Sequence, residues 1–83
     1  MKVTVKYFAS IREALGVSCE VVNTPGTTLA ALRDELIALG GAYAESLARG
    51  RTVRMALNQV MSDEAAVLVE GSEVAFFPPV TGG

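Results

Sequence analysis

The stretch KVTVKYF, residues 2–8, alternates polar and apolar side chains as far as Tyr7. This period of two predicts a half-buried β-strand, with Val3, Val5 and Tyr7 facing a hydrophobic core. Because 51% of the 83 residues are hydrophobic, the strand is expected to belong to one small globular domain. Burial stabilises a core of this size by only about 3–5 kcal/mol, so added stability from a partner subunit is a reasonable hypothesis.

Further strands are expected from short runs of β-favouring residues along the rest of the chain. They are residues 17–22, 53–57, 60–61 and 74–77. Asn58-Gln59 suits a tight turn between two of these runs, and residues 70–73 form another turn before the last. Cys19, in the first run, is expected to be a small, partly buried strand residue.

Two sets of signals predict helices. Residues 10–13 have the S-x-x-E form of a capping box and Gly16 is a stop signal, so a short helix is expected from about 11 to 15. The principal helix follows a cap at Thr27 or Thr28 and ends at Gly40-Gly41, and residues 42–47 add a short third helix. The principal helix has a core-facing stripe of leucines at helical spacing: Leu29, Leu32, Leu36 and Leu39. The order of elements indicates an α+β fold in which a helix covers one face of a mixed sheet, and a β-grasp is the natural candidate.

Composition argues against several classes of function. The net charge of -2 and the absence of any block of Lys or Arg argue against binding to nucleic acid or to an anionic membrane. No apolar stretch approaches the roughly 18 residues needed to span a bilayer, and the first residues resemble a strand more than a signal peptide. The cytoplasm is therefore the expected compartment.

The chain is poor in groups for self-contained catalysis. It has no histidine and one cysteine, which excludes a Cys/His zinc site and an internal disulfide, and it lacks a phosphate-binding loop. The adjacent Asp63 and Glu64 are expected in a solvated turn, and Arg12, Arg33 and Glu35 on exposed helix faces. We expect no metal site and no cofactor bound by this chain.

The C-terminus has a different character. Pro78 and Pro79 lack N–H donors, so the last strand must stop pairing there. We therefore divide the chain into a domain over residues 1–77 and an extended tail over residues 78–83, which can reach about 20 Å. The tail consists of Pro78, Pro79, Val80, Thr81, Gly82 and Gly83. The two glycines have no Cβ and can pass through a narrow channel, although a frayed end of no significance is the competing interpretation.

The terminal carboxylate of Gly83 is the candidate working group. Its ordinary pKa of about 3.3–3.7 makes it an anion at neutral pH and a poor electrophile. Activation as an acyl-adenylate, with Mg²⁺ on the nucleotide, would have to occur in another protein, because this chain has no loop for ATP.

Strand parity predicts a docking surface. If Val5 and Tyr7 face the core, Phe8 faces outward, and if Phe76 faces the core, Phe77 faces outward. The two outward rings would then form an apolar patch beside the start of the tail, suited to a partner protein. The alternative is that residues 60–69 cover both rings.

The chain resembles the MoaD/ThiS-type family of ubiquitin-like sulfur carriers, in particular its molybdopterin synthase branch. The resemblance covers essentially the whole chain and rests on three segments: VKYFASIREALG (5–16), ALNQ (56–59) and GSEVAFFPPVTGG (71–83). The ending FFPPVTGG is specific to the molybdopterin branch, whereas a bare Gly-Gly is shared with ubiquitin and the thiazole-forming carrier.

The resemblance implies a β-grasp fold and a role as the non-catalytic, sulfur-donating subunit of molybdopterin synthase. A ubiquitin-activating-like enzyme would adenylate Gly83 with ATP and Mg, and a sulfurtransferase donor would supply sulfur for a thiocarboxylate. The tail, with the thiocarboxylate at its end, would enter the active site of the large catalytic subunit of a heterotetramer. There it would donate sulfur to cyclic pyranopterin monophosphate and form the molybdopterin dithiolene.

The resemblance also implies a hydrophobic contact surface at Phe8, Met61 and Phe77, two of which strand parity reaches independently. Met61 replaces another aliphatic residue there and keeps the packing role. Residues 63–67 depart from the family pattern. Two alternatives remain: a ubiquitin-like modifier conjugated to lysine through Gly83, or a sulfur carrier of the thiazole pathway. A third interpretation is a binding module with an incidental tail.

Overall fold

A computed structural model describes residues 1–79 of the chain. Within this range five strands form one mixed sheet, and three helices pack against it. The strands are β1 (Lys2–Tyr7), β2 (Cys19–Asn23), β3 (Arg54–Leu57), β4 (Val60–Ser62) and β5 (Glu73–Phe77). The helices are α1 (Ala9–Leu15), α2 (Leu29–Ala38) and α3 (Gly41–Leu47).

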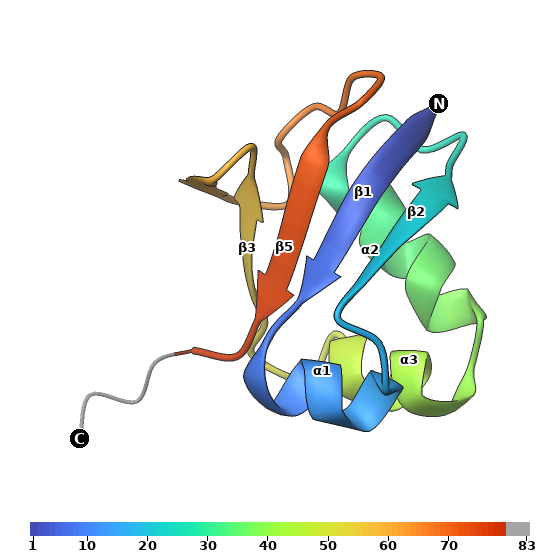
Figure 1. Ribbon diagram of the computed structural model, residues 1–83, viewed down its shortest axis with the longest axis vertical. Helices are drawn as coiled ribbons and strands as arrows, with labels where there is room; N and C mark the ends of the chain where they lie inside the picture. The colour runs from blue at the N-terminus through green and yellow to red at the C-terminus, as the bar shows by residue number, and fades with distance from the viewer. Residues whose placement is uncertain (80–83) are drawn as a thin grey trace.

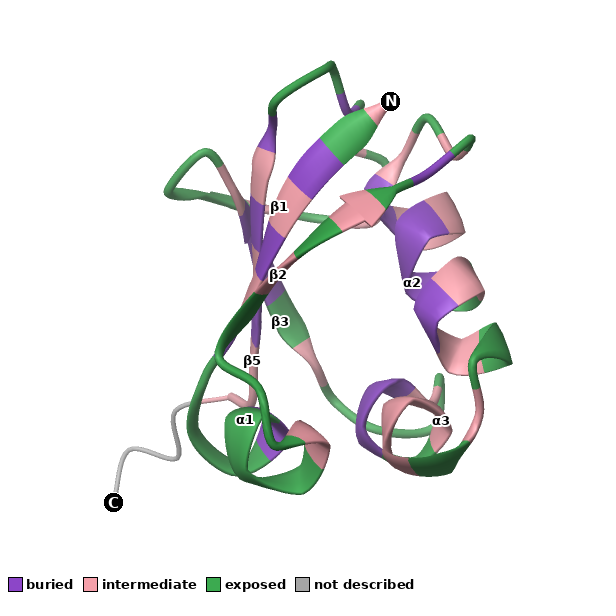
Figure 2. Ribbon diagram, turned by 45° about the vertical axis from the view of Figure 1, so that its right-hand side comes forward, coloured by how far each residue is buried: buried purple, intermediate pink, exposed green. Residues whose placement is uncertain are grey.

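The sheet has the strand order β2-β1-β5-β3-β4. Its first and last strands, β1 and β5, run parallel at its centre, and the other neighbouring pairs are antiparallel (Figure 1). Helix α2 covers one face, while α1 and α3 lie together near the end of the sheet where β1 and β5 finish (Figures 1 and 2). This is the α+β, β-grasp arrangement predicted from the order of elements.

The core lies between the sheet and the helices. Val3, Val5 and Tyr7 of β1 are fully buried, as are Val74 and Phe76 of β5, so the predicted parity of both strands is confirmed (Figure 2). Each such side chain stabilises the fold by roughly 1.5–3 kcal/mol through burial. Because side chains alternate along a strand, the next residue of each strand must face away from the helices.

Helix α2 begins where the sequence indicated. The side chain of Thr28 accepts a hydrogen bond from the N–H of Ala31, which makes Thr28 the N-cap. Three leucines form the buried stripe: Leu29, Leu32 and Leu36. The prediction for Leu39 is wrong, because this residue is the C-cap and its side chain is exposed. The chain then turns at Gly40, whose φ of 77° is in the left-handed region, and α3 starts directly after it.

The predicted capping box of the first helix is wrong. Helix α1 starts at Ala9, and its N-cap is Phe8, which has no side-chain capping bond. The carbonyl of Phe8 accepts from the N–H groups of Ile11 and Arg12, so the helix grows directly from the end of β1. The stop at Gly16 is confirmed, since Gly16 has a φ of 77° and donates its N–H to the carbonyl of Arg12.

Arg33 is buried, whereas the sequence analysis placed it on an exposed helix face. It lies one turn after Leu29 on the same inner face of α2, and only 6% of its surface is exposed. Its guanidinium donates to the carbonyl oxygens of Leu47, Ala48 and Arg51 at 2.7, 2.8 and 3.2 Å. These bonds fix the end of α3 and the loop that follows it to α2.

Two smaller expectations about charged side chains also change. Glu64 forms ion pairs with Arg33 and Arg49, although the adjacent Asp63 does lie in an exposed turn. Glu35 is partly buried and accepts a hydrogen bond from the hydroxyl of Thr24. No helix within residues 1–79 has the length and apolar character to cross a membrane.

Candidate functional site

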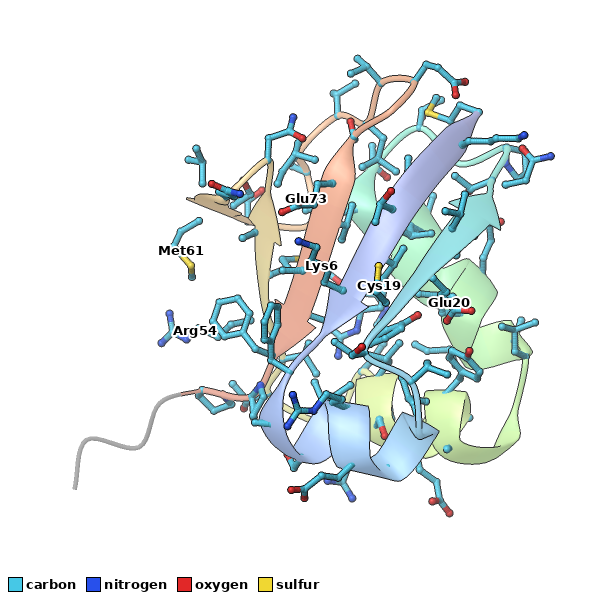
Figure 3. All side chains as sticks on the ribbon, in the orientation of Figure 1. Lys6, Cys19, Glu20, Arg54, Met61 and Glu73 are labelled. Carbon is cyan, nitrogen blue, oxygen red and sulfur yellow. The ribbon has the colours of Figure 1, made fainter. Side chains whose placement is uncertain are left out.

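The predicted docking residues lie on the sheet face opposite α2, which we call the uncovered face. Phe8 keeps 44% of its surface exposed and Met61 57%, while Phe77 is partly buried. The alternative in which residues 60–69 cover both rings is therefore wrong for Phe8. Met61 belongs to that segment, and its side chain projects at the edge of the uncovered face (Figure 3).

Strand register brings the three residues to one region of this face. The N–H of Phe8 donates to the carbonyl of Phe76 at 3.2 Å, which places Phe8 beside the end of β5 where Phe77 lies. Across the sheet, Met61 is opposite Ala56, and Ala56 is opposite Ala75. Ala75 is partly exposed and Ala56 is only 8% exposed, so the larger side chains supply most of the exposed apolar surface here. We call Phe8, Phe77 and Met61, with the two alanines, the apolar patch.

A tight hairpin sets the position of Met61. Asn58 and Gln59 join β3 to β4, and both have positive φ values, 50° and 68°. A turn in which both central residues have positive φ matches the right-handed twist of the two strands that it joins, so it is favoured in two-residue hairpins. The predicted turn and return strand are therefore confirmed. Because the turn fixes the register, Met61 lies on the same face of the sheet as its partner Ala56, whereas Val60 and Ser62 lie on the other face.

Charged side chains border the apolar patch. Lys6 and Glu73 form an ion pair of 3.4 Å on the uncovered face, and their charges offset each other (Figure 3). Arg54 lies directly opposite Phe77 on β3 and is exposed. The sequence analysis missed Arg54 as a site residue, although its alternation with the buried Met55 would have placed it on the same outward face. The rim of the patch thus presents the guanidinium of Arg54 beside the end of β5.

An open hollow of about 310 Å³ adjoins the patch through Met61 and Arg54. Its other walls include Met55, Arg33 and Glu64, and the last two are paired with each other at 3.3 Å. Within residues 1–79 no three His, Cys, Asp or Glu side chains gather as a metal site requires. The hollow is suited to receive part of a partner's surface, because its walls combine apolar side chains with paired charges.

The chain leaves the sheet beside the apolar patch. Strand β5 ends at Phe77, as predicted, and Pro78 and Pro79 lie outside any strand and partly exposed (Figure 1). The remaining predicted tail residues lie outside the described part of the chain: Val80, Thr81, Gly82 and Gly83. The role assigned to Gly83 and the division between residues 1–77 and 78–83 stay predictions.

A polar cluster on the helix side of the sheet supports the end of β1 that carries Phe8. Glu20 accepts hydrogen bonds from the hydroxyls of Tyr7 and Tyr43, each at 2.7 Å. Burial, followed by the bond to Glu20, raises the pKa of Tyr7 above its ordinary value. For Tyr43 the bond to Glu20 is the main cause of the raised pKa, and burial adds to it. The cluster ties β1, β2 and α3 together on the helix side of the sheet.

Cys19 is exposed, so the expectation of a partly buried thiol is wrong. It lies opposite Lys6 on β2, the strand at the edge of the sheet, and its side chain projects from the uncovered face (Figure 3).

A protein-family model described as the ThiS family matches residues 5–83, which include the second half of β1, strands β2 to β5, helices α1 to α3 and the C-terminal Gly-Gly. The chain belongs to the ThiS family. This assignment agrees with the resemblance inferred from its sequence motifs.

Relatives of this ThiS-family chain extend over nearly its full length. The molybdopterin synthase sulfur carrier subunit of Escherichia coli is 38% identical over 81 residues, which cover 98% of this chain and 99% of the relative. The protein of the same name from Haemophilus influenzae is 37% identical over 79 residues, covering 95% and 96%. The one from Mycobacterium tuberculosis is 38% identical over 85 residues, covering 100% and 99%.

Solved structures agree with the fold of this family member. SAMP1 from Haloferax volcanii superposes with a TM-score of 0.79 at 24% identity, with full coverage of both chains. A chain from the complex of subunits 1 and 2 of the molybdopterin-converting factor from Helicobacter pylori superposes with a TM-score of 0.70 at 27% identity, again with full coverage. The β-grasp assignment is thereby confirmed.

Proposed function

We propose that this ThiS-family chain is the sulfur carrier subunit of a molybdopterin synthase. The observation that carries the proposal is the similarity, at 37–38% identity over nearly the whole chain, to three proteins that bear this name. The exposed apolar patch beside the end of β5 gives additional support, because a carrier must dock on partners while its end is processed by them.

In the proposed cycle, Gly83 is the reacting residue. An adenylating partner joins its carboxylate to AMP from ATP, with Mg²⁺ on the nucleotide, and pyrophosphate leaves. Sulfur from a sulfurtransferase donor then displaces AMP and gives a thiocarboxylate. Two sulfur transfers, each from one thiocarboxylated chain, place the two sulfur atoms of the dithiolene on cyclic pyranopterin monophosphate, and water supplies the oxygen that returns each carboxylate. Because the cycle draws on ATP, we place it in the cytoplasm.

Partner groups supply the catalysis in this proposal. This chain has no histidine and no phosphate-binding loop, so it contributes binding and delivery. Phe8, Met61 and Phe77 would dock on the large catalytic subunit, and the tail from Pro78 would enter its active site. The structural similarity to a chain of the Helicobacter pylori complex of two converting-factor subunits supports a pairing of this kind.

Intact mass spectrometry after co-expression with an adenylating enzyme and a sulfur donor tests the proposal. We expect a mass gain equal to the replacement of one oxygen by one sulfur, located at Gly83 by fragmentation. A matched chain lacking Gly82 and Gly83 should show no gain. Lysine-linked conjugates without any thiocarboxylate would overturn the proposal in favour of a protein modifier, since the same activation chemistry serves both.

A further inference from the structure

The outer edge of β2 is open to another strand. The N–H of Tyr7 donates to the carbonyl of Ser18, and the N–H of Thr24 donates to the carbonyl of Met1. In an antiparallel pair, bonding direction alternates along the strand, so the even-numbered residues of this segment bond to β1. The N–H and C=O groups of the odd-numbered residues therefore point away from the sheet. These residues are Cys19, Val21 and Asn23.

This edge has little of the usual protection against pairing. Natural edge strands are shielded by Lys, by Pro, by a bulge, by an inward-pointing charge or by a covering segment. Of these, β2 has the inward-pointing charge of Glu20, which the hydroxyls of Tyr7 and Tyr43 hold within its own copy. Between Cys19 and Asn23 there is no Lys or Pro, and the register with β1 is unbroken. Within residues 1–79 no other strand pairs with β2. Val21 at its centre is 67% exposed.

We infer that β2 pairs antiparallel with β2 of a second copy of this chain. One register pairs the largest number of the outward-pointing N–H and C=O groups. It places Val21 opposite Val21 of the second copy, and Cys19 opposite its Asn23. Three pairs of this kind supply about six hydrogen bonds, two for each pair. A shift of two residues in either direction loses one of the three pairs.

The charges of the strand permit this pairing. In the same register Glu20 lies opposite Val22, so no charged side chain of β2 lies directly opposite a like charge, and the two Glu20 residues are diagonal neighbours. The Glu20 carboxylate is also engaged by the hydroxyls of Tyr7 and Tyr43 within its own copy. The residues on the uncovered face, Cys19, Val21 and Asn23, are all uncharged.

The dimer extends the sheet without obstructing the apolar patch. The two-fold axis of an antiparallel strand pair is perpendicular to the sheet, so the uncovered faces of both copies lie on the same side. Strand β4, which carries Met61, is at the opposite edge from β2 and becomes the outermost strand at each end (Figure 1). The inference is therefore independent of the proposed function, and its test needs no sulfur chemistry.

Disulfide cross-linking tests the register directly. Residues in a hydrogen-bonded antiparallel pair have Cα atoms about 5.5 Å apart, which is within the range that a disulfide bridges. In a Cys19→Ser background, Val21→Cys should form a covalent dimer under mild oxidation. Val69→Cys in the same background is the matched control, because Val69 is similarly exposed, at 59%, but lies outside β2. Equal cross-linking of the two variants would overturn the inference.

Sedimentation equilibrium of the full-length chain gives a second measurement. Val21→Lys places two like charges opposite each other and should raise the dimer Kd at least tenfold, whereas Val69→Lys should leave it unchanged. A chain that stays monomeric up to about 1 mM would overturn the inference. Hydrogen exchange of the amides of Cys19, Val21 and Asn23 gives a further check. If these amides became protected only on addition of the large subunit, the edge would belong to that partner and the inference would be overturned.

Discussion

The ring of Tyr7 stacks on the ring of Phe76 in the core, with centroids 6.4 Å apart and planes inclined by 17°. The two residues are register partners on the parallel strands β1 and β5. Because both rings face the helices, the following residues, Phe8 and Phe77, face away from them. A buried aromatic pair thus fixes the outward direction of two phenylalanines in the apolar patch. The first prediction tests that patch.

Phe77→Asp should weaken binding to the large subunit at least tenfold, which corresponds to about 1.4 kcal/mol. The change places a charge at the centre of an apolar contact, where truncation of an aromatic residue alone often has a large effect. Titration calorimetry of the purified subunits measures it. Val69→Asp, on an exposed valine away from the patch, is the control and should bind normally. An unaltered Kd for Phe77→Asp, with an intact fold, would refute a role for the patch.

Deletion of Gly82 and Gly83 should abolish sulfur transfer to the pterin while leaving the fold and most large-subunit binding in place. The described core is built from residues between Val3 and Phe76, which the deletion leaves in place, whereas the proposed reacting carboxylate is lost. Three quantities are measured for both chains: thiolation of the pterin after treatment with the activating enzyme and sulfur donor, the thermal unfolding temperature, and the affinity for the large subunit. Normal thiolation by the shortened chain would disprove the role of Gly83.

Periodicity was sufficient to predict most of this fold. Alternation in residues 2–8 and 74–77 identified the two central strands and the face of every aromatic residue on them, because a period of two allows only two faces. The leucine spacing located α2, and Asn58-Gln59 located the hairpin that positions Met61. The same alternation in β3 indicates that Arg54 is a rim residue, although this requires the observation that β3 lies beside β5.

The burial of Arg33 leads to a prediction about stability. Arg33→Leu should lower the free energy of unfolding by about 3 kcal/mol, since the carbonyls of Leu47, Ala48 and Arg51 would lose their donor and Glu64 a buried partner. Urea denaturation of both proteins at neutral pH measures the difference. Arg49→Ala, which removes an exposed guanidinium also bonded to Glu64, should cost far less. Equal losses for the two variants would contradict a structural role for Arg33.

Three of the wrong predictions share a physical cause. The burial of Arg33, the exposure of Cys19 and the start of α1 are determined by contacts between segments that are distant in sequence. Local sequence patterns carry no information about such contacts. The charge of Arg33 suggested exposure, yet carbonyls from the loop after α3 satisfy it. Cys19 is exposed because β2 is an edge strand. The capping box at Ser10 was overridden because β5 holds Phe8 and sets where the chain turns.

The final prediction concerns the response of the fold to alkaline pH. In the folded chain the pKa of Tyr7 is raised by burial and by its bond to the Glu20 carboxylate, and the pKa of Tyr43 is raised chiefly by that same carboxylate. In the unfolded chain both hydroxyls titrate near pH 10. Above that pH the unfolded state releases protons that the folded state retains, so the free energy of unfolding must fall as pH rises. Below pH 10 the contribution of the two tyrosines is fully present.

Tyr7→Phe should remove the larger part of this alkaline loss, because phenylalanine has no proton to release, and Tyr43→Phe should remove a smaller part. At neutral pH Tyr7→Phe should also cost about 1 kcal/mol, since Glu20 loses one of its two tyrosine donors. Urea denaturation at a series of pH values between 8 and about 11.5 measures both effects, with the double variant as the reference for a chain lacking both hydroxyls. If Tyr7→Phe kept the full slope above pH 10, the alkaline loss would have to come from other groups, and the Tyr7–Glu20–Tyr43 cluster would not control it.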